Sequence, residues 1–150
     1  MAAKVYDESW PEARKWEAKV ADTIRAKGFR VTHHSQDDPL NPQDLTVHHG
    51  KADLPVEVKR RPTLRWGQYD GPFLDVAKVH AILAESEVML FVVVPHDLTQ
   101  QRAWITQDDL LHLDIDVKDV HPDHHDPDDP LDKGDPKYVI PYHWFKRLDE

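Results

Sequence analysis

In the stretch DLPVEVKRRP, which runs from Asp53 to Pro62, apolar and polar side chains alternate. Every second residue from 54 to 58 is apolar, which predicts one buried face of a β-strand. Glu57 and Lys59 point to the opposite face, with their Cα atoms about 7 Å apart. A carboxylate beside an ammonium fits either a solvated surface or a metal site. The rest of the chain has to distinguish these two interpretations.

The composition is that of a folded protein and excludes several classes. A length of 150 residues fits one domain over residues 1–150, and five Trp and several apolar runs argue against disorder. The longest apolar run, Val88–Pro95, is too short to span a bilayer, and the first ten residues lack the apolar core of a signal peptide. With no cysteine, disulfides and Cys-based zinc sites are excluded. We expect a cytoplasmic protein without membrane contact.

The net charge of −9 is concentrated in one segment. Residues 108–136 contain eleven Asp and two Lys, which accounts for the whole net charge, so the remainder of the chain is neutral. A basic cluster, formed by Lys59, Arg60, Arg61 and Arg65, precedes this segment. Because local fields matter more than net charge for binding a polyanion, DNA remains a candidate partner.

The N-terminal part predicts an amphipathic helix. Ser9-Trp10-Pro11-Glu12 matches a capping box with Ser9 as N-cap, and Lys27-Gly28 matches a helix end. Between them, apolar residues recur at helical spacing. Glu17 lies on the apolar side of this helix. The helix alone allows two interpretations of Glu17, as an edge residue that reaches water or as part of a site.

Three strands are expected next, over residues 29–34, 44–49 and 54–60. Gly50-Lys51 predicts a hairpin turn, so the second and third strands should be adjacent and antiparallel. A polar loop, residues 35–43, separates the first two. A second helix is expected over about residues 73–85, followed by a buried strand over Val88–Val94, a strand over residues 102–106 and a short helix or turn at residues 107–111. The fold class expected from this order is α/β, with a central mixed β-sheet flanked by helices in the order α-β-β-β-α-β-β.

The segment of residues 114–136 is rich in Asp, Pro and His and has no hydrophobic periodicity, which predicts a long surface loop or insertion. An apolar, strand-like pattern resumes over residues 138–145 and should return the chain to the core. His121, His124 and His125 match no closed zinc site, so a solvated loop is favoured over a metal site there.

The expected hairpin brings Asp44 toward Glu57 and Lys59. The start of one strand faces the end of the next, and alternation places Asp44 on the same face as that pair. Two carboxylates there can bind Mg²⁺ or Mn²⁺, which prefer oxygen ligands. Such a metal polarises a phosphodiester and acidifies a bound water, and Lys59 can stabilise the developing charge or orient the water.

The pattern Asp-x(12)-Glu-x-Lys in this strand order resembles the PD-(D/E)xK nuclease superfamily, which has the restriction-endonuclease-like fold. The sequences Glu17-Ala18-Lys19-Val20 and Gly28-Phe29-Arg30-Val31 resemble the branch of archaeal Holliday-junction resolvases and Mrr-type nucleases. The resemblance covers roughly residues 10–94. One departure is Pro42-Gln43-Asp44, where a residue separates the proline from the aspartate.

This resemblance implies an Mg²⁺- or Mn²⁺-dependent endonuclease that cuts DNA. It assigns Asp44 and Glu57 as metal ligands, Lys59 as the catalytic lysine and Glu17 as an accessory acid. One site cuts one strand, so cleavage of two strands would require a homodimer. Two alternatives stay open at this point: a non-cleaving nucleic-acid- or protein-binding module of the same fold, and an acidic protein that mimics DNA.

Residues near the expected site are candidates for contact with DNA. Arg60, Arg61, Arg65 and Gln68 can hold phosphates, and Trp66 and Tyr69 can stack on bases. The alternative for this loop is an ordinary surface segment whose aromatic residues pack into the core. Lys78 and Asp75 on the second helix either flank the cleft or form a solvated pair. Of the pairs His33-His34 and His48-His49, at most one member each can face a ligand, and a structural role is favoured.

Overall fold

The computed structural model describes residues 2–34, 43–68, 70–116 and 136–150, with side chains described from residue 12 onward. The expected order of elements is present. Helix α1 (Ala2–Ala26) precedes strands β1 (Arg30–His33), β2 (Leu45–His49) and β3 (Ala52–Arg60). They are followed by β4 (Phe73–Asp75), α2 (Val76–Leu83), β5 (Val88–Val94) and β6 (Gln101–Thr106). The last elements are a 3₁₀-helix η1 (Asp108–His112), β7 (Asp114–Asp116), β8 (Lys137–Val139), a 3₁₀-helix η3 (Tyr142–Trp144) and β9 (Lys146–Arg147).

The central sheet is mixed, as expected. Its six strands lie in the order β1-β2-β3-β5-β6-β9, and β3 and β5 are parallel while the other neighbours are antiparallel. The β2–β3 hairpin turns at Gly50-Lys51, because His49 pairs with Ala52. Strand β4 lies outside this sheet in a small one of order β4-β8-β7. The predicted fold class is confirmed: a central mixed sheet flanked by helices.

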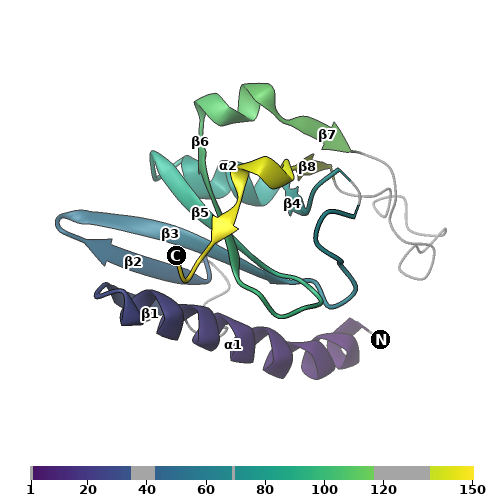
Figure 1. Cartoon of the computed structure of the whole chain (residues 1–150), viewed down its shortest axis with the longest axis horizontal. Coiled ribbons are helices and arrows are strands. Elements are labelled where there is room, and N and C mark those ends of the chain that lie inside the picture. The colour runs from purple at the N-terminus through teal and green to yellow at the C-terminus, as the bar shows by residue number, and fades with distance from the viewer. Residues whose placement is uncertain (1, 35–42, 69, 117–135) are drawn as a thin grey trace.

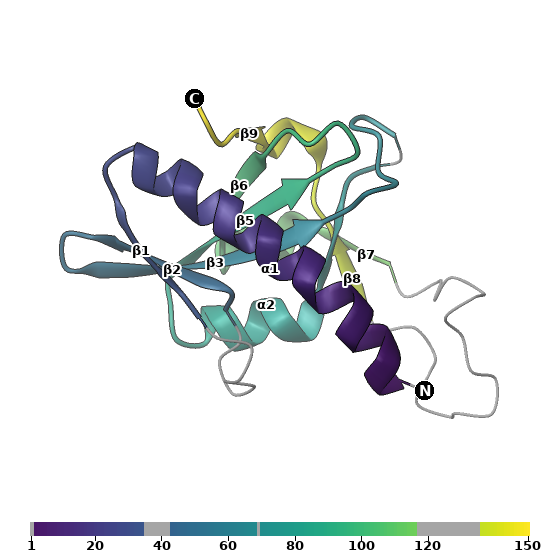
Figure 2. The ribbon, with the colours of Figure 1, turned by 90° about the horizontal axis from the view of Figure 1, so that it is seen from below.

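Two apolar layers enclose the sheet, with α1 on one face and α2 on the other (Figures 1 and 2). Strand β5 is buried on both faces, which explains why its sequence is continuously apolar rather than alternating. Leu90, Val92 and Val94 face α1, and Met89, Phe91 and Val93 face α2. Helix α1 runs obliquely across its face of the sheet (Figure 2). Strand β3, beside β5, therefore has a helix over each of its faces.

Three expectations about element boundaries are wrong. The first helix begins at Ala2, so Ser9 is not its N-cap. Ala, Lys and Glu residues before Ser9 favour helix, and Glu12 accepts a hydrogen bond from Trp16 Nε1 (2.9 Å) one turn ahead instead of capping. The second helix begins at Val76, because Phe73–Asp75 pair with β8 as strand β4.

The third correction concerns the segment of residues 114–136. Its first three residues are not a loop but strand β7, which pairs with β8. Residues 117–135 lie outside the described part of the chain, as do residues 35–42 and Tyr69. Beyond them the chain returns to the core as expected, since Tyr138, Ile140 and Phe145 are buried.

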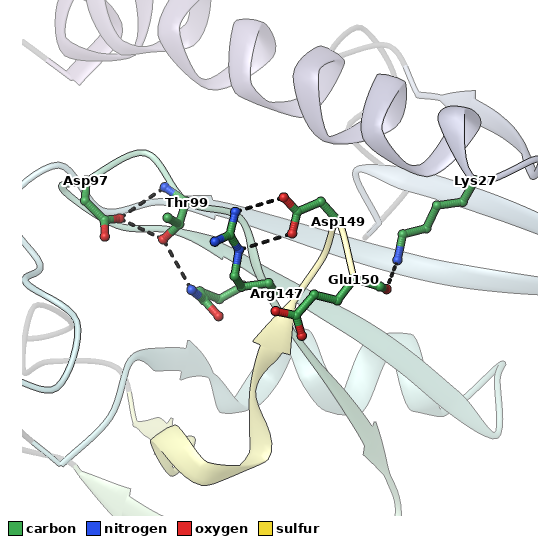
Figure 3. A network of polar contacts seen from close by, with 7 residues as sticks. Lys27, Asp97, Thr99, Arg147, Asp149 and Glu150 are labelled. Carbon is green, nitrogen blue, oxygen red and sulfur yellow. Dashed lines mark hydrogen bonds and ion pairs between the residues drawn. The ribbon is translucent and has the colours of Figure 1, made fainter.

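A polar network fixes the C-terminal residues of the described chain beside α1 and β6 (Figure 3). Lys27 at the end of α1 donates to the main-chain carbonyl of Glu150, and Arg147 pairs with Asp149 (2.9 Å). Leu148 between them is buried at 2% exposure and donates its amide to Gln100 O. Residues 146–150 thus close one end of the apolar layer under α1. In the described residues, no helix is long and apolar enough to cross a membrane.

We predict that Gly71→Ala destabilises the protein. A Cβ at position 71 would lie 2.0 Å from the carbonyl oxygen of Ile140, so the main chain would have to move. The expected loss is about 2 kcal/mol or more of unfolding free energy, in the range of overpacking substitutions. Urea denaturation measures it.

The control is Gly50→Asn in the hairpin turn, where φ is +60° and a side chain would meet nothing within 4 Å. Asn tolerates this left-handed conformation, so the variant should stay within about 1 kcal/mol of wild type. Equal unfolding free energies for Gly71→Ala and wild type would contradict the close approach of the two chains.

Candidate active site

Glu57 and Lys59 lie on β3, on the face toward α2. Val56 and Val58 face α1 and belong to its apolar layer, as the alternation predicts. The opposite face of the strand is not solvated, however, because Glu57 has 0% exposure. A fully buried carboxylate is costly unless it is paired or bound to a cation. A solvent-exposed strand face is therefore excluded as the explanation of the Glu57–Lys59 pair.

Asp44 is brought beside Glu57 by the β2–β3 hairpin. Its amide donates to Val56 O (3.1 Å), which continues the β2–β3 ladder one residue beyond Leu45 and places Asp44 opposite Glu57. The Asp44 carboxylate accepts a hydrogen bond from the Val58 amide (2.8 Å) through Oδ2. This bond orients the side chain toward β3. The sequence-based expectation that Asp44 approaches Glu57 agrees with this geometry.

Glu17 reaches the same place from α1. It is buried at 6% exposure and lines one pocket together with Asp44, Glu57 and Lys59. The interpretation of Glu17 as an edge residue that reaches water is wrong. His33 Nε2 lies 3.8 Å from Glu17 Oε1 and forms no hydrogen bond within the described residues. The sequence favoured a structural role for His33, although its two-residue spacing from Val31 places it on the face toward α1.

Burial and neighbouring carboxylates raise the pKa of Glu17 and of Glu57. Burial raises the pKa of Glu17 to about 8, helped by the charge of Asp44, a hydrogen bond with Asp44 and the charge of Glu57. Burial, together with the charge of Asp44, also raises the pKa of Glu57 to about 7, although Lys59 and Lys78 oppose this shift. Near neutral pH Glu17 is therefore protonated. Carboxyl groups arranged so closely without enough counter-charge are typical of functional sites.

Two lysines approach the same oxygen of Glu57. Lys78 Nζ on α2 lies 2.9 Å from Glu57 Oε1, and Lys59 Nζ lies 3.2 Å from it. Burial lowers the pKa of Lys78, but the negative charge of Glu57 and the hydrogen bond with it outweigh burial and raise the pKa overall. The solvated Asp75–Lys78 pair weighed from the sequence is not the arrangement found, since Asp75 forms its ion pair with Lys137.

The pocket that these groups line has a volume of about 460 Å³ and is rimmed by cations. Arg60 and Arg61 both line it, but their surroundings differ. Arg60 donates to Val94 O (3.0 Å) and Pro95 O (2.5 Å) and lies over the Trp16 ring, 5.3 Å from its centroid. The Arg61 guanidinium forms no hydrogen bond or ion pair with the described residues, and burial lowers its pKa. Among the described residues, the whole Arg61 guanidinium is thus without a bonded partner, whereas Arg60 donates through Nη1.

The loop after β3 contributes less to the pocket than the sequence suggested. Arg65 and Gln68 are exposed but do not line it. Trp66 packs edge-on against Tyr142 and Phe145, with centroids 4.7 and 5.1 Å away, so its ring belongs to the core side of the loop. Tyr69 lies outside the described residues. Of the candidate DNA contacts, Lys78 and Arg61 both line the pocket. Lys78 donates to the Glu57 carboxylate, and the Arg61 guanidinium has no bonded partner among the described residues.

The remaining histidine candidates have structural partners. His34 contacts Thr46 Oγ1 (2.6 Å), and His48 contacts Thr32 Oγ1 (2.7 Å) and Asp53 Oδ1 (2.8 Å). His49 lies edge-on to Phe29, with ring centroids 5.3 Å apart. These contacts agree with the structural role favoured from the sequence. His121, His124 and His125 lie outside the described residues.

The donor set of this pocket fits a hard divalent cation. Within residues 2–34, 43–68, 70–116 and 136–150, no three His, Asp or Glu side chains are arranged closely enough to hold a metal by themselves. Mg²⁺, however, is commonly held by one or two carboxylates and keeps several waters. Glu57 Oε2 is buried and has no hydrogen-bond partner in the described part of the chain, and Asp44 lies next to it. An orphaned carboxylate oxygen of this kind is what a cation would satisfy.

Comparisons with known proteins find a similarity in structure but none in sequence. No family model and no curated protein matches the chain. The structure is similar to that of Hjc from Archaeoglobus fulgidus, a Holliday junction resolvase, with 14% sequence identity and a TM-score of 0.49. The match covers 67% of this chain and 77% of Hjc.

We predict that the stability of the metal-free protein depends on the protonation of Glu17. Its pKa is about 8 in the folded state against 4.5 for an ordinary Glu, so the stabilising contribution of its proton is fully present below pH 4.5. This contribution is lost as the pH rises toward and through 8. Glu17→Gln, which mimics the protonated acid, should therefore match wild type near pH 5 and exceed it at pH 8.5.

Thermal melting of both proteins with a metal chelator present, at several pH values from 5 to 8.5, measures this difference. The chelator matters because a bound cation would compensate the carboxylates. Comparing the two proteins at each pH cancels the titration of other groups, including His33, whose pKa is lowered by burial and by Arg14. Parallel curves for the two proteins would exclude the raised pKa of Glu17.

Proposed function

We propose that this protein is a metal-dependent nuclease that hydrolyses phosphodiester bonds of DNA. The observation that carries the proposal is the convergence of Glu17, Asp44 and Glu57 in one pocket with Lys59 and Lys78 on the Glu57 carboxylate. These groups come from both helices and from the β2–β3 hairpin. A fold that only required stability would gain nothing from burying three acids together, because like charges repel.

Asp44 and Glu57 would hold the metal, Mg²⁺ or Mn²⁺. When bound, such an ion supplies Lewis-acid polarisation of the phosphate and a water of lowered pKa. The Val58 amide donates to Asp44 Oδ2 and so orients this carboxylate toward Glu57. Glu57 Oε2 has no competing hydrogen bond among the described residues.

The other residues would act on the phosphate. Lys59 is 25% exposed, so its ammonium can reach a non-bridging phosphate oxygen while it stays beside Glu57, and can stabilise the charge that develops there. Arg61, whose guanidinium is unbonded within the described residues, could donate to a second phosphate oxygen or a neighbouring phosphate. Glu17, protonated and hydrogen-bonded to Asp44, would hold that carboxylate in position. Arg65 and Gln68 lie outside this pocket, so a DNA contact by either would lie outside it as well. A DNA contact by Arg60 would compete with its bonds to two main-chain carbonyls.

We predict that Lys59→Ala and Glu57→Gln abolish cleavage. Loss of one charge-stabilising group at such a site typically lowers the rate by roughly 10²–10³-fold. Gln is chosen at position 57 because Glu57 is fully buried, so Ala would leave a cavity beside two unpaired lysines. The measurement is Mg²⁺-dependent cutting of single-stranded, duplex, flap and four-way-junction DNA, with melting curves to verify folding.

The same assay separates the nuclease from its alternatives. Binding of DNA without cutting by the wild-type protein would support a non-cleaving module of the same fold. Neither binding nor cutting would favour an acidic DNA mimic. Cutting at wild-type rates by both folded variants would mean that the pocket is not the active site.

We also predict that the neighbouring arginines act differently. Arg61→Ala should weaken DNA binding while the protein stays folded, because its guanidinium makes no bond with the described residues. Arg60→Ala should lower stability by about 1–3 kcal/mol, because it removes a donor to two carbonyls and a contact with Trp16. Fluorescence anisotropy with labelled duplex in chelator measures the first effect, and denaturation measures the second. Identical behaviour of the two variants would contradict this division.

A further inference from the structure

Lys78 makes a contact that the proposed reaction does not require. Its ammonium lies 2.9 Å from Glu57 Oε1, although Lys59 already lies 3.2 Å from the same oxygen. Both lysines are partly exposed, at 29% and 25%, whereas the Glu57 side chain is at 1%. Two like charges on one oxygen repel each other, so the second ammonium needs a reason.

The two lysines compensate the buried carboxylate of Glu57 in the metal-free pocket. Both ammonium groups lie within 3.2 Å of Glu57 Oε1, and Asp44 and Glu17 line the same pocket. A divalent cation would therefore enter a pocket whose charge is already compensated. At separations of a few ångströms its repulsion from a nearby ammonium is substantial, even with effective screening by the protein. Metal binding is thus favoured if one ammonium leaves.

Lys78 is better placed to leave than Lys59. Lys59 is two residues from Glu57 on the same strand, so its position follows that of the carboxylate. Lys78 belongs to α2, and its stem is long and flexible. The pocket it lines also contains Arg61, whose free donors would hold a phosphate nearby. A DNA phosphate at Arg61 would offer the Lys78 ammonium a new partner.

We propose that Lys78 is a transferable counter-ion: it neutralises Glu57 while the metal is absent and moves to a DNA phosphate when metal and DNA enter. This inference rests on the proposed function, since it takes Glu57 as a metal ligand and DNA as the polyanion. Its consequence is that metal and DNA bind cooperatively. By thermodynamic linkage, DNA must then strengthen metal binding by the same factor by which metal strengthens DNA binding.

The test compares Mn²⁺ affinity, measured by titration calorimetry, in wild type and Lys78→Met. Removing a competing ammonium should tighten Mn²⁺ binding without DNA by roughly tenfold or more. With a cleavage-resistant phosphorothioate duplex present, wild type should bind Mn²⁺ tighter than without it, while Lys78→Met should gain much less. The calorimetric readout does not depend on catalysis.

Three further variants make the test specific. Lys51→Met removes the same charge from the exposed hairpin turn and should leave Mn²⁺ affinity unchanged. Glu57→Gln should abolish the tight Mn²⁺ site, which verifies where the ion binds. Lys78→Gln removes the charge but keeps a donor for Glu57, so it should reproduce the effect of Lys78→Met if the latter folds poorly.

Each result decides a different point. Equal Mn²⁺ affinities in wild type and both Lys78 variants, with binding lost in Glu57→Gln, would overturn the role of Lys78 and leave the nuclease proposal intact. If the duplex increased Mn²⁺ affinity equally in wild type and in the Lys78 variants, the role of Lys78 would likewise be overturned and the nuclease proposal would stand. Absence of any Glu57-dependent Mn²⁺ binding would overturn both proposals. Tighter binding in the Lys78 variants with a wild-type protein that cuts no DNA would support the counter-ion role and reject the nuclease.

Discussion

A carboxylate with no exposed surface has to be compensated by its neighbours, and in this protein that carboxylate is Glu57. Strand β3 carries it into the space beneath α2, between a hairpin partner and a parallel neighbour. Lys59 comes from the same strand and Lys78 from the helix above. The ion pair between Lys78 and Glu57 thus connects α2 to the sheet, and its strength depends on the charge of the Glu57 carboxylate. Stability and the proposed chemistry depend on the same ion pairs.

The candidate site lies where groups from both faces of the sheet can meet. Strand β2 begins at Leu45, and Asp44 continues its pairing by one residue, because its amide donates to Val56 O and its carbonyl accepts from the His34 amide. Glu17 reaches this point from α1, on one face, and Lys78 reaches it from α2, on the other. A site in the middle of the sheet could not combine them, because the strands would separate the two helices. The end of β2 therefore determines which residues can cooperate.

The sequence was sufficient for those parts of the fold and site that local patterns encode. Alternation located β2 and β3, the Gly50-Lys51 turn set their register, and that register alone brings Asp44 to Glu57. By contrast, β4 and β7 are strands only because each pairs with β8, which is distant from them in the sequence. The contact of Lys78 with Glu57 is non-local in the same way. The direction of the Lys78 side chain depends on how α2 packs across the sheet, and no spacing in the sequence specifies that packing.

Arg60 and Arg61 are neighbours in one basic run, but their side chains have different surroundings because they lie on opposite faces of the sheet. In the sequence they are equivalent members of one cluster. At the end of β3, alternation sends them to opposite sides: Arg60 toward Trp16 of α1, and Arg61 toward the side of Asp75 and Glu57. The first bonds to the carbonyls of Val94 and Pro95, while the guanidinium of the second forms no hydrogen bond or ion pair with the part of the chain that the structure describes. The number of cations in a cluster is therefore a poor guide to its affinity for a polyanion, because a cation that already donates to main-chain carbonyls has fewer donors left for a phosphate.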